Sequence, residues 1–290
     1  MYKRILVPLD GSKSSESVVP YASFFATRLQ LPLDLLHVNE VENRVASDAK
    51  GTDYLTQVAA RLSNSVVDCF IENGRAADVI IDCASREPDT LIAMATHGRS
   101  GAQRWLLGSV AQKVLQAANN PLLLIRSKEE IRSSNEARIR SVIVPLDGSH
   151  LAEGIFPHVL YLAKHLKLEV VLIRSYTVPT TGYFVGTGVL QPAIGELANK
   201  IKQEITEYLQ GKMEQLQAEG IDKVSFLALE GSGPGEIIDL AQKTSDNIVA
   251  MSTHGRSGMG RWVLGSVTDR VVSYCGDPVL VIRPKARTGL

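Results

Sequence analysis

Two glycine-rich segments of this chain have the composition of an anion-binding loop. The segment Thr96–Val110 reads THGRSGAQRWLLGSV, and Thr253–Val267 repeats it with twelve of fifteen positions identical. In the first segment nine residues separate Gly98 from a Gly108-Ser109 pair. If a helix begins at Ser109, its first N–H groups lack intrahelical partners and its dipole is positive at that end. Phosphate is a ligand suited to such a helix start.

Residues around these segments fit the other parts of a nucleotide. Gly98 and Gly101 allow a ligand to approach the backbone without interference from a Cβ atom, and Ser109 adds a hydroxyl donor. Asp10 follows a strand-like run and could accept hydrogen bonds from ribose hydroxyls, as acidic residues do in other nucleotide-binding folds. The second copy has the matching residues Asp147, Gly255, Gly258, Gly265 and Ser266.

Each of these residues also has a purely structural interpretation. Glycines are common at turns, Ser109 could be an N-cap worth about 1 kcal/mol, and Asp10 could cap a helix or hold the Asp-Gly turn. However, the copies share only twelve of thirty-four residues from Pro8 to Val41, against twelve of fifteen in the loop. The loop has therefore diverged less than its surroundings, and together the residues favour binding.

The sequence indicates binding rather than catalysis. His97 and His254 have no His or Cys partner at ligand spacing, so we predict no metal centre and interpret both as positioning the backbone. No Ser/His/Asp or Cys/His set can be assembled from spacing, and no catalytic base is evident. No P-loop string occurs, and the glycines of 231–236 are interpreted as a turn and a helix start.

Apolar runs and helical periods alternate along the first copy. The predicted strands are 5–9, 33–38, 66–71, 90–95 and 121–125, and the predicted helices include 18–29, 77–85 and 109–118. Buried runs separated by helices indicate a parallel sheet with helices on both faces. Pro20 implies that the first helix is kinked or begins later. If the first and fourth strands are neighbours, the Asp10 and Thr96 loops meet where such sheets bind ligands.

The repeat divides the chain into two units. Residues 8–41 match 145–178 at an offset of 137, and residues 74–126 match 231–283 at an offset of 157, so the second copy is about twenty residues longer. The extra length predicts a long amphipathic helix over 194–216, preceded by a mobile loop at 180–188. The charged stretch 127–138 has the composition of a linker. We predict an α/β fold with two doubly wound domains, 1–135 and 136–290, each with a five-stranded parallel sheet.

Composition narrows the function classes. The 290 residues contain 31 basic and 31 acidic side chains, so net charge does not favour nucleic acid or an anionic membrane as a partner. The chain has no long apolar span and no leader-like start. Cys69, Cys83 and Cys275 lack metal-ligand or disulfide spacing, and we interpret them as buried thiols in a reducing cytoplasm.

Taken together, these strings resemble the universal stress protein family in its tandem form, along nearly the whole chain. The resemblance rests on a strand ending Val-Pro-Leu-Asp-Gly-Ser, a strand ending Leu-His-Val, and Thr-His-Gly-Arg-Ser-Gly with Leu-Gly-Ser. The family's ATP-binding branch carries Gly-x2-Gly-x9-Gly-Ser/Thr. Its last glycines fall here on Gly98 and Gly108, and on Gly255 and Gly265. Its first glycine is replaced by Ala95 and by Ser252.

The resemblance implies roles for single residues. Asp10 and Asp147 would face the ribose, and Val38 would meet the adenine through its backbone. The matching residue in copy two is Ser175, beside Arg174 where copy one has His37, which predicts a second site that either differs in affinity or is silent. The predicted binding set also contains these residues: Pro8, Val110, Pro145 and Val267.

The resemblance also implies ligands and assembly. The expected ligand is ATP, with AMP or ADP as alternatives and Mg²⁺ accompanying ATP. Family members associate through their last strands, so the two domains are expected to pair within the chain, with a homodimer also plausible. The predicted function is a cytoplasmic, nucleotide-binding stress-response module. A nucleotide-free scaffold that acts through protein–protein contacts, and a slow ATPase, are the alternatives.

Overall fold

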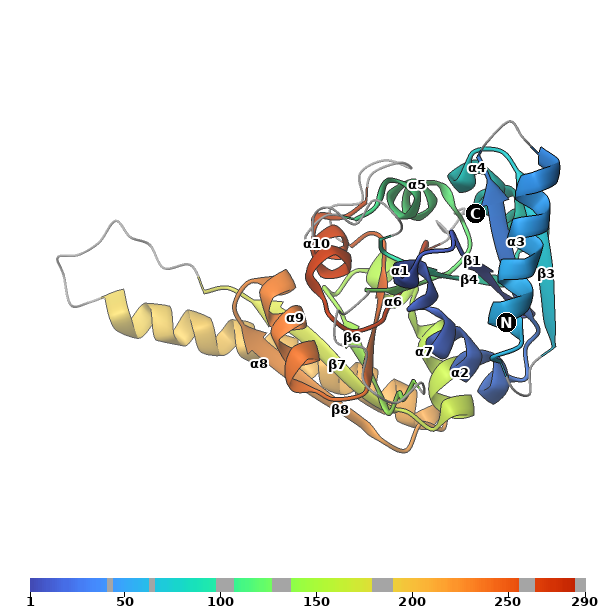
Figure 1. Ribbon diagram of the computed structural model, residues 1–290. Helices are drawn as coiled ribbons and strands as arrows, with labels where there is room; N and C mark the ends of the chain where they lie inside the picture. The colour runs from blue at the N-terminus through green and yellow to red at the C-terminus, as the bar shows by residue number, and fades with distance from the viewer. Residues whose placement is uncertain are drawn as a thin grey trace, which may run out of the picture.

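The computed structural model describes residues 1–40, 44–62, 66–97, 107–126, 137–178, 190–255 and 264–284. Its elements form two series of the same order, which we call the first and second units (Figure 1). The first unit consists of β1 (Arg4–Pro8), α1 (Lys13–Glu16), α2 (Val19–Leu29), β2 (Leu33–Asn39), α3 (Arg44–Ala59), β3 (Val67–Asn73), α4 (Ala76–Ser85), β4 (Thr90–Ala95), α5 (Ser109–Ala117) and β5 (Leu122–Ile125).

The second unit repeats this order with one much longer helix. It consists of β6 (Ser141–Pro145), α6 (His150–Glu153), α7 (Phe156–Leu166), β7 (Glu169–Tyr176), α8 (Leu190–Ala218), β8 (Val224–Glu230), α9 (Gly233–Lys243), β9 (Asn247–Ser252), α10 (Ser266–Tyr274) and β10 (Val279–Ile282). The first turns of α8 extend beyond the sheet, away from the first unit (Figure 1).

One continuous sheet runs through both units. Its strand order is β3-β2-β1-β4-β5-β10-β9-β6-β7-β8. Pairing is parallel within each unit, whereas β5 and β10 pair antiparallel with Leu124 opposite Val279. The α/β fold with a five-stranded parallel sheet in each unit is therefore confirmed, and so is the predicted pairing of the last strands within the chain. The predicted boundary near residue 135 lies outside the described residues.

Apolar side chains of the sheet alternate between two cores. Ile5 and Val7 of β1 pack toward α2 and α3, whereas Leu6 packs toward the face that carries α4 and α5. All six residues of β4 are buried, as expected for a central strand of a parallel sheet covered on both faces. Both cores continue into the second unit, so each face of the sheet carries one core that the two units share.

Contacts outside the sheet also join the units. Arg126 Nη1 donates to Ser273 O at 2.8 Å, and Arg283, its counterpart in the repeat, donates through Nη2 to Gln116 O. On the other face, the Tyr2 hydroxyl lies 2.7 Å from His158 Nδ1. The two units are therefore held together on both sides of the β5–β10 pair.

Several local expectations are refined by the structure. The first helix ends at Glu16 and a second begins at Val19, with Pro20 in its first turn, where the missing N–H costs nothing. The predicted long helix exists as α8 and extends past both predicted ends. The predicted loop 180–188 falls outside the described residues, as does most of the linker.

Two expectations were incomplete or wrong. No helix was assigned between the second and third strands of the first unit, but α3 occupies this place. Its apolar signal is confined to its last turns, where Leu55 and Val58 are fully buried. Cys83 and Cys275 are buried as predicted, whereas Cys69 is exposed because it lies on β3, at the edge of the sheet.

Candidate functional site

The sheet reverses its strand order between β1 and β4, and β6 and β9 repeat this neighbourhood in the second unit. Arg4 to Leu6 pair with Thr90 to Ile92, and Ser141 to Ile143 pair with Asn247 to Val249. The loops that leave the carboxyl ends of these strands start at Leu9 and Thr96, and at Leu146 and Thr253. This is the place where open parallel sheets bind ligands.

Asp10 and Asp147 hold the turns that follow β1 and β6. Asp10 Oδ1 accepts from the N–H and the hydroxyl of Ser12 at 2.9 and 2.6 Å. Asp147 Oδ1 accepts from the same groups of Ser149 at the same distances. One carboxylate oxygen in each unit therefore has a structural role. Because Oδ1 is held by these hydrogen bonds, the other carboxylate oxygen also has a fixed position, at the carboxyl ends of the strands.

The helices α5 and α10 begin beside these turns with a glycine at the N-cap position. Gly108 and Gly265 are the N-cap residues, so Ser109 and Ser266 occupy the first helical position instead of capping the helix. Both serines are exposed. By contrast, Ser12 and Ser149 cap α1 and α6 by accepting from Ser15 N and Ala152 N. Among the residues that the structure describes, no side chain caps the first N–H groups of α5 and α10, and the helix dipole is positive there.

Glycine is required at both N-caps because the end of the preceding strand lies against it. Gly108 N donates to Thr96 O at 2.8 Å, and Gly265 N donates to Thr253 O at 2.9 Å. A Cβ atom on Gly108 would lie 3.0 Å from the same Thr96 oxygen, and one on Gly265 would lie 2.8 Å from the Thr253 oxygen. This contact joins the strand to the helix start in each unit.

The residues that replace the first family glycine are buried. Ala95 and Ser252 end β4 and β9 and are 9% and 7% exposed. The Ser252 hydroxyl donates to Ala152 O at the end of α6, at 3.3 Å. A small side chain at this position is therefore accommodated against α6 in the second unit.

The two histidines adopt the same arrangement in both units. His97 Nδ1 lies 3.0 Å from Thr96 Oγ1, and His254 Nδ1 lies 2.9 Å from Thr253 Oγ1. Their Nε2 atoms are buried and have no hydrogen-bond partner among the described residues. The His97 carbonyl accepts from Ser14 Oγ at 3.1 Å, which ties the β4 loop to α1.

The units also differ where β2 and β7 end. His37 Nδ1 lies 2.7 Å from Leu9 O, and its ring packs edge-on to Tyr54 with centroids 5.9 Å apart. In the second unit the guanidinium of Arg174 lies against Gly148 and over the ring of Tyr208. Val38 and Ser175 are both half-buried on the opposite face of their strands.

The remaining predicted site residues are placed as follows. Pro8 and Pro145 end β1 and β6, while Val110 and Val267 lie in the first turns of α5 and α10. Gly255 faces Asp147, because a Cβ atom on Gly255 would collide with the Asp147 carboxylate. Gly98, Gly101 and Gly258 lie outside the described residues. In each unit, the other predicted residues lie together at the end of the sheet that is formed by the carboxyl ends of the strands.

Tyr208 was not identified from the sequence. It lies on α8, far along the chain from Arg174, and its hydroxyl donates to Glu153 Oε1 at 2.8 Å. Burial and the Glu153 carboxylate raise the pKa of the Tyr208 phenol, while Arg174 opposes them. The aligned His37/Arg174 difference is a sequence signal that points to this location.

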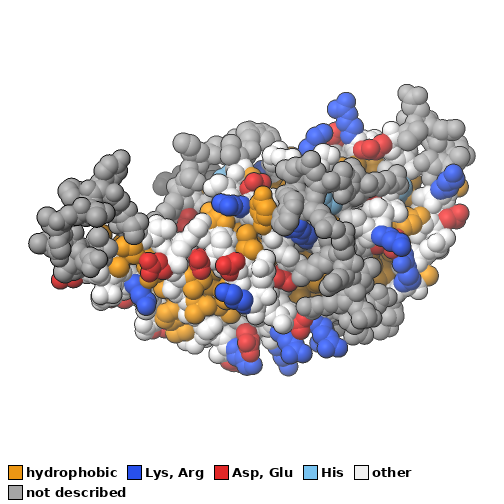
Figure 2. All heavy atoms as spheres, turned by 60° about the vertical axis from the view of Figure 1, so that its left-hand side comes forward, with side chains coloured by type: hydrophobic (Ala, Val, Ile, Leu, Met, Phe, Trp, Pro, Cys, Tyr) orange, Lys and Arg blue, Asp and Glu red, His pale blue; other side chains and the backbone are white. Residues whose placement is uncertain are grey.

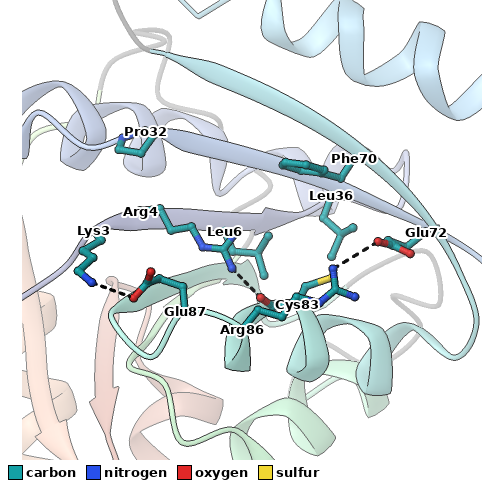
Figure 3. Close-up of a pocket in the computed structure, with 10 residues that line it drawn as sticks. All are labelled: Lys3, Arg4, Leu6, Pro32, Leu36, Phe70, Glu72, Cys83, Arg86 and Glu87. Carbon is teal, nitrogen blue, oxygen red and sulfur yellow. Dashed lines mark hydrogen bonds and ion pairs between the residues drawn. The ribbon is translucent and has the colours of Figure 1, made fainter.

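A separate groove of about 330 Å³ opens on the face of the first unit that carries α4 (Figure 3). Its floor is apolar and includes Leu6, Leu36 and Phe70. The cations around it are paired: Lys3 Nζ lies 3.2 Å from Glu87, and Arg86 Nη1 lies 3.8 Å from Glu72. Lys3 also marks the amino end of β1, so the groove is distant from the Asp10 turn.

The second unit has apolar residues on the corresponding face. The repeat places Val171, Leu227, Leu229 and Leu240 where the first unit has Asp34, Phe70, Glu72 and Cys83. Leu227 is 39% exposed, and Figure 2 shows hydrophobic side chains gathered on the surface of the second unit. The charged groove is therefore a property of the first unit.

Within the described residues, no cluster of His, Cys, Asp or Glu side chains could hold a metal ion, and no helix is long and apolar enough to cross a membrane.

Comparison with solved structures shows the same fold over nearly the whole chain. A universal stress protein from Archaeoglobus fulgidus superimposes with a TM-score of 0.72 at 20% identity, covering 97% of this chain and 98% of that chain. A protein of unknown function from Pseudomonas aeruginosa superimposes with a TM-score of 0.70 at 19% identity, covering 98% and 93%.

Sequence comparison identifies relatives of the single unit and of the tandem chain. A universal stress protein of Methanocaldococcus jannaschii is 31% identical over 152 residues, covering 52% of this chain and 85% of that protein. A universal stress protein of Mycolicibacterium smegmatis is 24% identical over 302 residues, covering 97% of both chains. The family model "Universal stress protein family" matches residues 1–126 and again 138–283. The chain therefore belongs to the universal stress protein family and carries two copies of its domain.

Proposed function

We propose that this protein binds ATP or a related adenine nucleotide, AMP or ADP, at the carboxyl edge of the sheet. The observation that carries the proposal is the helix start beside Asp10, built again beside Asp147. In each unit a glycine N-cap leaves the helix start without a side-chain cap, and an exposed serine hydroxyl lies next to it. The phosphates would bind there, where N–H groups and the helix dipole favour negative charge.

The other predicted residues would supply the rest of the nucleotide site. Asp10 and Asp147 would accept from the ribose, and the backbone of Val38 or Ser175 would meet the adenine. With ATP, Mg²⁺ would be held mainly by the phosphates, since the metal keeps several waters in such sites. Nucleotide binding would set the conformation or partner choice of a cytoplasmic stress-response module. We also propose that the protein forms a homodimer. Any catalytic activity would be limited to slow hydrolysis of ATP.

An aspartate at the helix start tests the placement of the phosphates. Ser109→Asp puts a carboxylate at the first position of α5, where the helix dipole stabilises it by about 0.3–1 kcal/mol. The side chain is exposed, so we expect the fold to retain its stability. A carboxylate there repels phosphate, so ATP affinity at the first unit should fall at least tenfold. Ser266→Asp should do the same in the second unit.

Isothermal titration calorimetry with ATP, ADP and AMP, with and without Mg²⁺, measures this effect. The matched control is Gly211→Ala, in a part of α8 with no atom within 4 Å of the added Cβ. Mass spectrometry of small molecules released from the purified protein identifies any retained nucleotide. If wild-type protein neither retains nor binds an adenine nucleotide, the proposal is wrong and a nucleotide-free scaffold replaces it. If binding survives Ser109→Asp and Ser266→Asp, the phosphates bind elsewhere.

A further inference from the structure

The second unit contains a cation where the first has an imidazole. At the repeat offset of 137, Arg174 corresponds to His37. His37 contacts the carbonyl of Leu9, at the end of the strand that leads to Asp10. Arg174 extends instead to the turn itself: its Nη1 and Cζ atoms lie 2.8 and 3.1 Å from where a Cβ atom on Gly148 would be. A side chain at Gly148 would occupy the place of the guanidinium.

The Arg174 guanidinium is held in this position. Its Cζ atom lies 5.0 Å from the centroid of the Tyr208 ring, within the range of a cation–π contact. The Tyr208 hydroxyl donates to Glu153, whose other oxygen pairs with Lys212 Nζ at 2.9 Å. The ring is thereby fixed from α6 and α8. Gly148 has φ +85°, a conformation that glycine adopts freely and that brings the turn close to the guanidinium.

The turn beside Arg174 also carries the acidic residue of the site. Asp147 directly precedes Gly148, and both Arg174 and Asp147 act electrostatically on Tyr208. In dinucleotide-binding folds, an acidic residue accepts from free ribose hydroxyls, whereas an arginine nearby accommodates a phosphate on the ribose. The second unit has both residues at one turn, while the first unit has Asp10 with a histidine.

We propose that the second unit selects an adenine nucleotide that carries a phosphate on its ribose, and that Arg174 determines this selectivity. Arg174 would form charge-assisted hydrogen bonds to the ribose phosphate while it remains stacked on Tyr208. The first unit would prefer the unmodified ribose. This inference rests on the proposed function, because it assigns a ligand class to one of the two proposed sites.

Isomeric nucleotides distinguish the effect of the number of phosphates from the effect of their position on the ribose. ADP, adenosine 2′,5′-bisphosphate and adenosine 3′,5′-bisphosphate each carry two phosphates, so a preference among them reports where the phosphate is recognised. Calorimetric titration of the Ser109→Asp protein measures the second unit, and titration of the Ser266→Asp protein measures the first. We expect one of the bisphosphates to bind the second unit about ten- to a hundredfold more tightly than ADP, as one hydrogen bond to a charged group provides.

Substitution of Arg174 should abolish the preference. Arg174→His copies the first unit, and Arg174→Met removes the charge while keeping an unbranched side chain. Both should bring the bisphosphate affinity down to that of ADP. The matched control is Arg140→Met, which removes an equal charge from a side chain that is 74% exposed, at the amino end of β6. It should leave the preference unchanged.

The outcomes distinguish this inference from the proposed function. If the wild-type protein binds ADP but the second unit does not prefer either bisphosphate, the inference is wrong and the proposed function stands. The inference is equally wrong if the preference persists in both Arg174 variants, or if they weaken ADP and the bisphosphates by the same factor. If none of the three probes nor ATP binds, the proposed function itself fails.

Discussion

Asp34 is a buried carboxylate that exists in only one unit. It is 4% exposed on β2, and Arg4 Nη1 lies 2.6 Å from its Oδ2 atom. Burial raises the pKa of Asp34, and the hydrogen bond and charge of Arg4 oppose this rise. Arg4 also donates to Thr90 Oγ1 and to Cys83 O. The second unit replaces the pair by Ser141 and Val171, so the fold does not depend on the ion pair.

Removing one partner of the Arg4–Asp34 pair should therefore destabilise the protein more than replacing both partners. Arg4→Ser leaves Asp34 without its counter-charge, and we expect a loss of about 3–5 kcal/mol in the free energy of unfolding. Adding Asp34→Val copies the second unit and should recover at least half of that loss. Urea unfolding near pH 7 measures both effects. Equal losses in the single and double variants would contradict this prediction.

The junction between a strand end and a helix start determines the geometry of the candidate site. The carbonyl of Thr253 accepts from Gly265 N, and α10 begins at the next residue. The same geometry joins Thr96 to Gly108 and α5. Because strand and helix approach through backbone atoms, a side chain at either glycine must separate them.

Two glycine-to-alanine substitutions should therefore change the stability of the protein in opposite directions. Gly265→Ala places a Cβ atom 2.8 Å from Thr253 O, and overpacking of this kind costs about 1–3 kcal/mol. Gly211→Ala, inside α8 with nothing within 4 Å, should stabilise the protein by about 0.5–1 kcal/mol, since alanine is the better helix former. Differential scanning calorimetry gives both shifts. A stabilising Gly265→Ala would show that the junction is not tight.

A histidine between the two units makes the stability of the protein depend on pH. Burial, followed by the charge of the amino terminus, lowers the pKa of His158 to about 4. Its Nδ1 lies 2.7 Å from the Tyr2 hydroxyl, and a neutral imidazole accepts the hydrogen bond that a protonated one cannot.

The direction of this pH dependence follows from the linkage between proton binding and folding. The folded pKa lies below the ordinary value of 6.5, so the unfolded chain binds more protons between pH 6.5 and 4, and stability falls as pH falls through this window. The total effect of this group is about 3 kcal/mol. His158→Gln, which still offers an acceptor, should lose this part of the pH dependence. His150→Gln is the control because His150 is 96% exposed. Unfolding midpoints measured from pH 4 to 7 that fall equally in wild type and His158→Gln would contradict the assignment.

Much of the fold was predictable because its signals are local. Buried runs such as Thr90–Ala95 are apolar over their whole length, and this strand has the predicted bounds. The helix start at Ser109 was predictable from the Gly-Ser pair. The helix α3 was not, since only its last turns carry the apolar spacing. The exposure of Cys69 was not predictable either, because the sequence of an edge strand resembles that of a buried strand until the neighbouring strands are known.

The two related units and their parallel α/β architecture can be read from the amino-acid sequence, which also predicts the loop residues that would bind a nucleotide. Periodicity and repeated strings carry that information along the chain. The joining of both units into one sheet of ten strands, through β5 and β10, is evident from the three-dimensional arrangement alone. The same arrangement placed Tyr208 under Arg174 and Tyr2 against His158. These contacts join residues far apart in the chain, so their energy depends on distances that no local pattern of residues encodes.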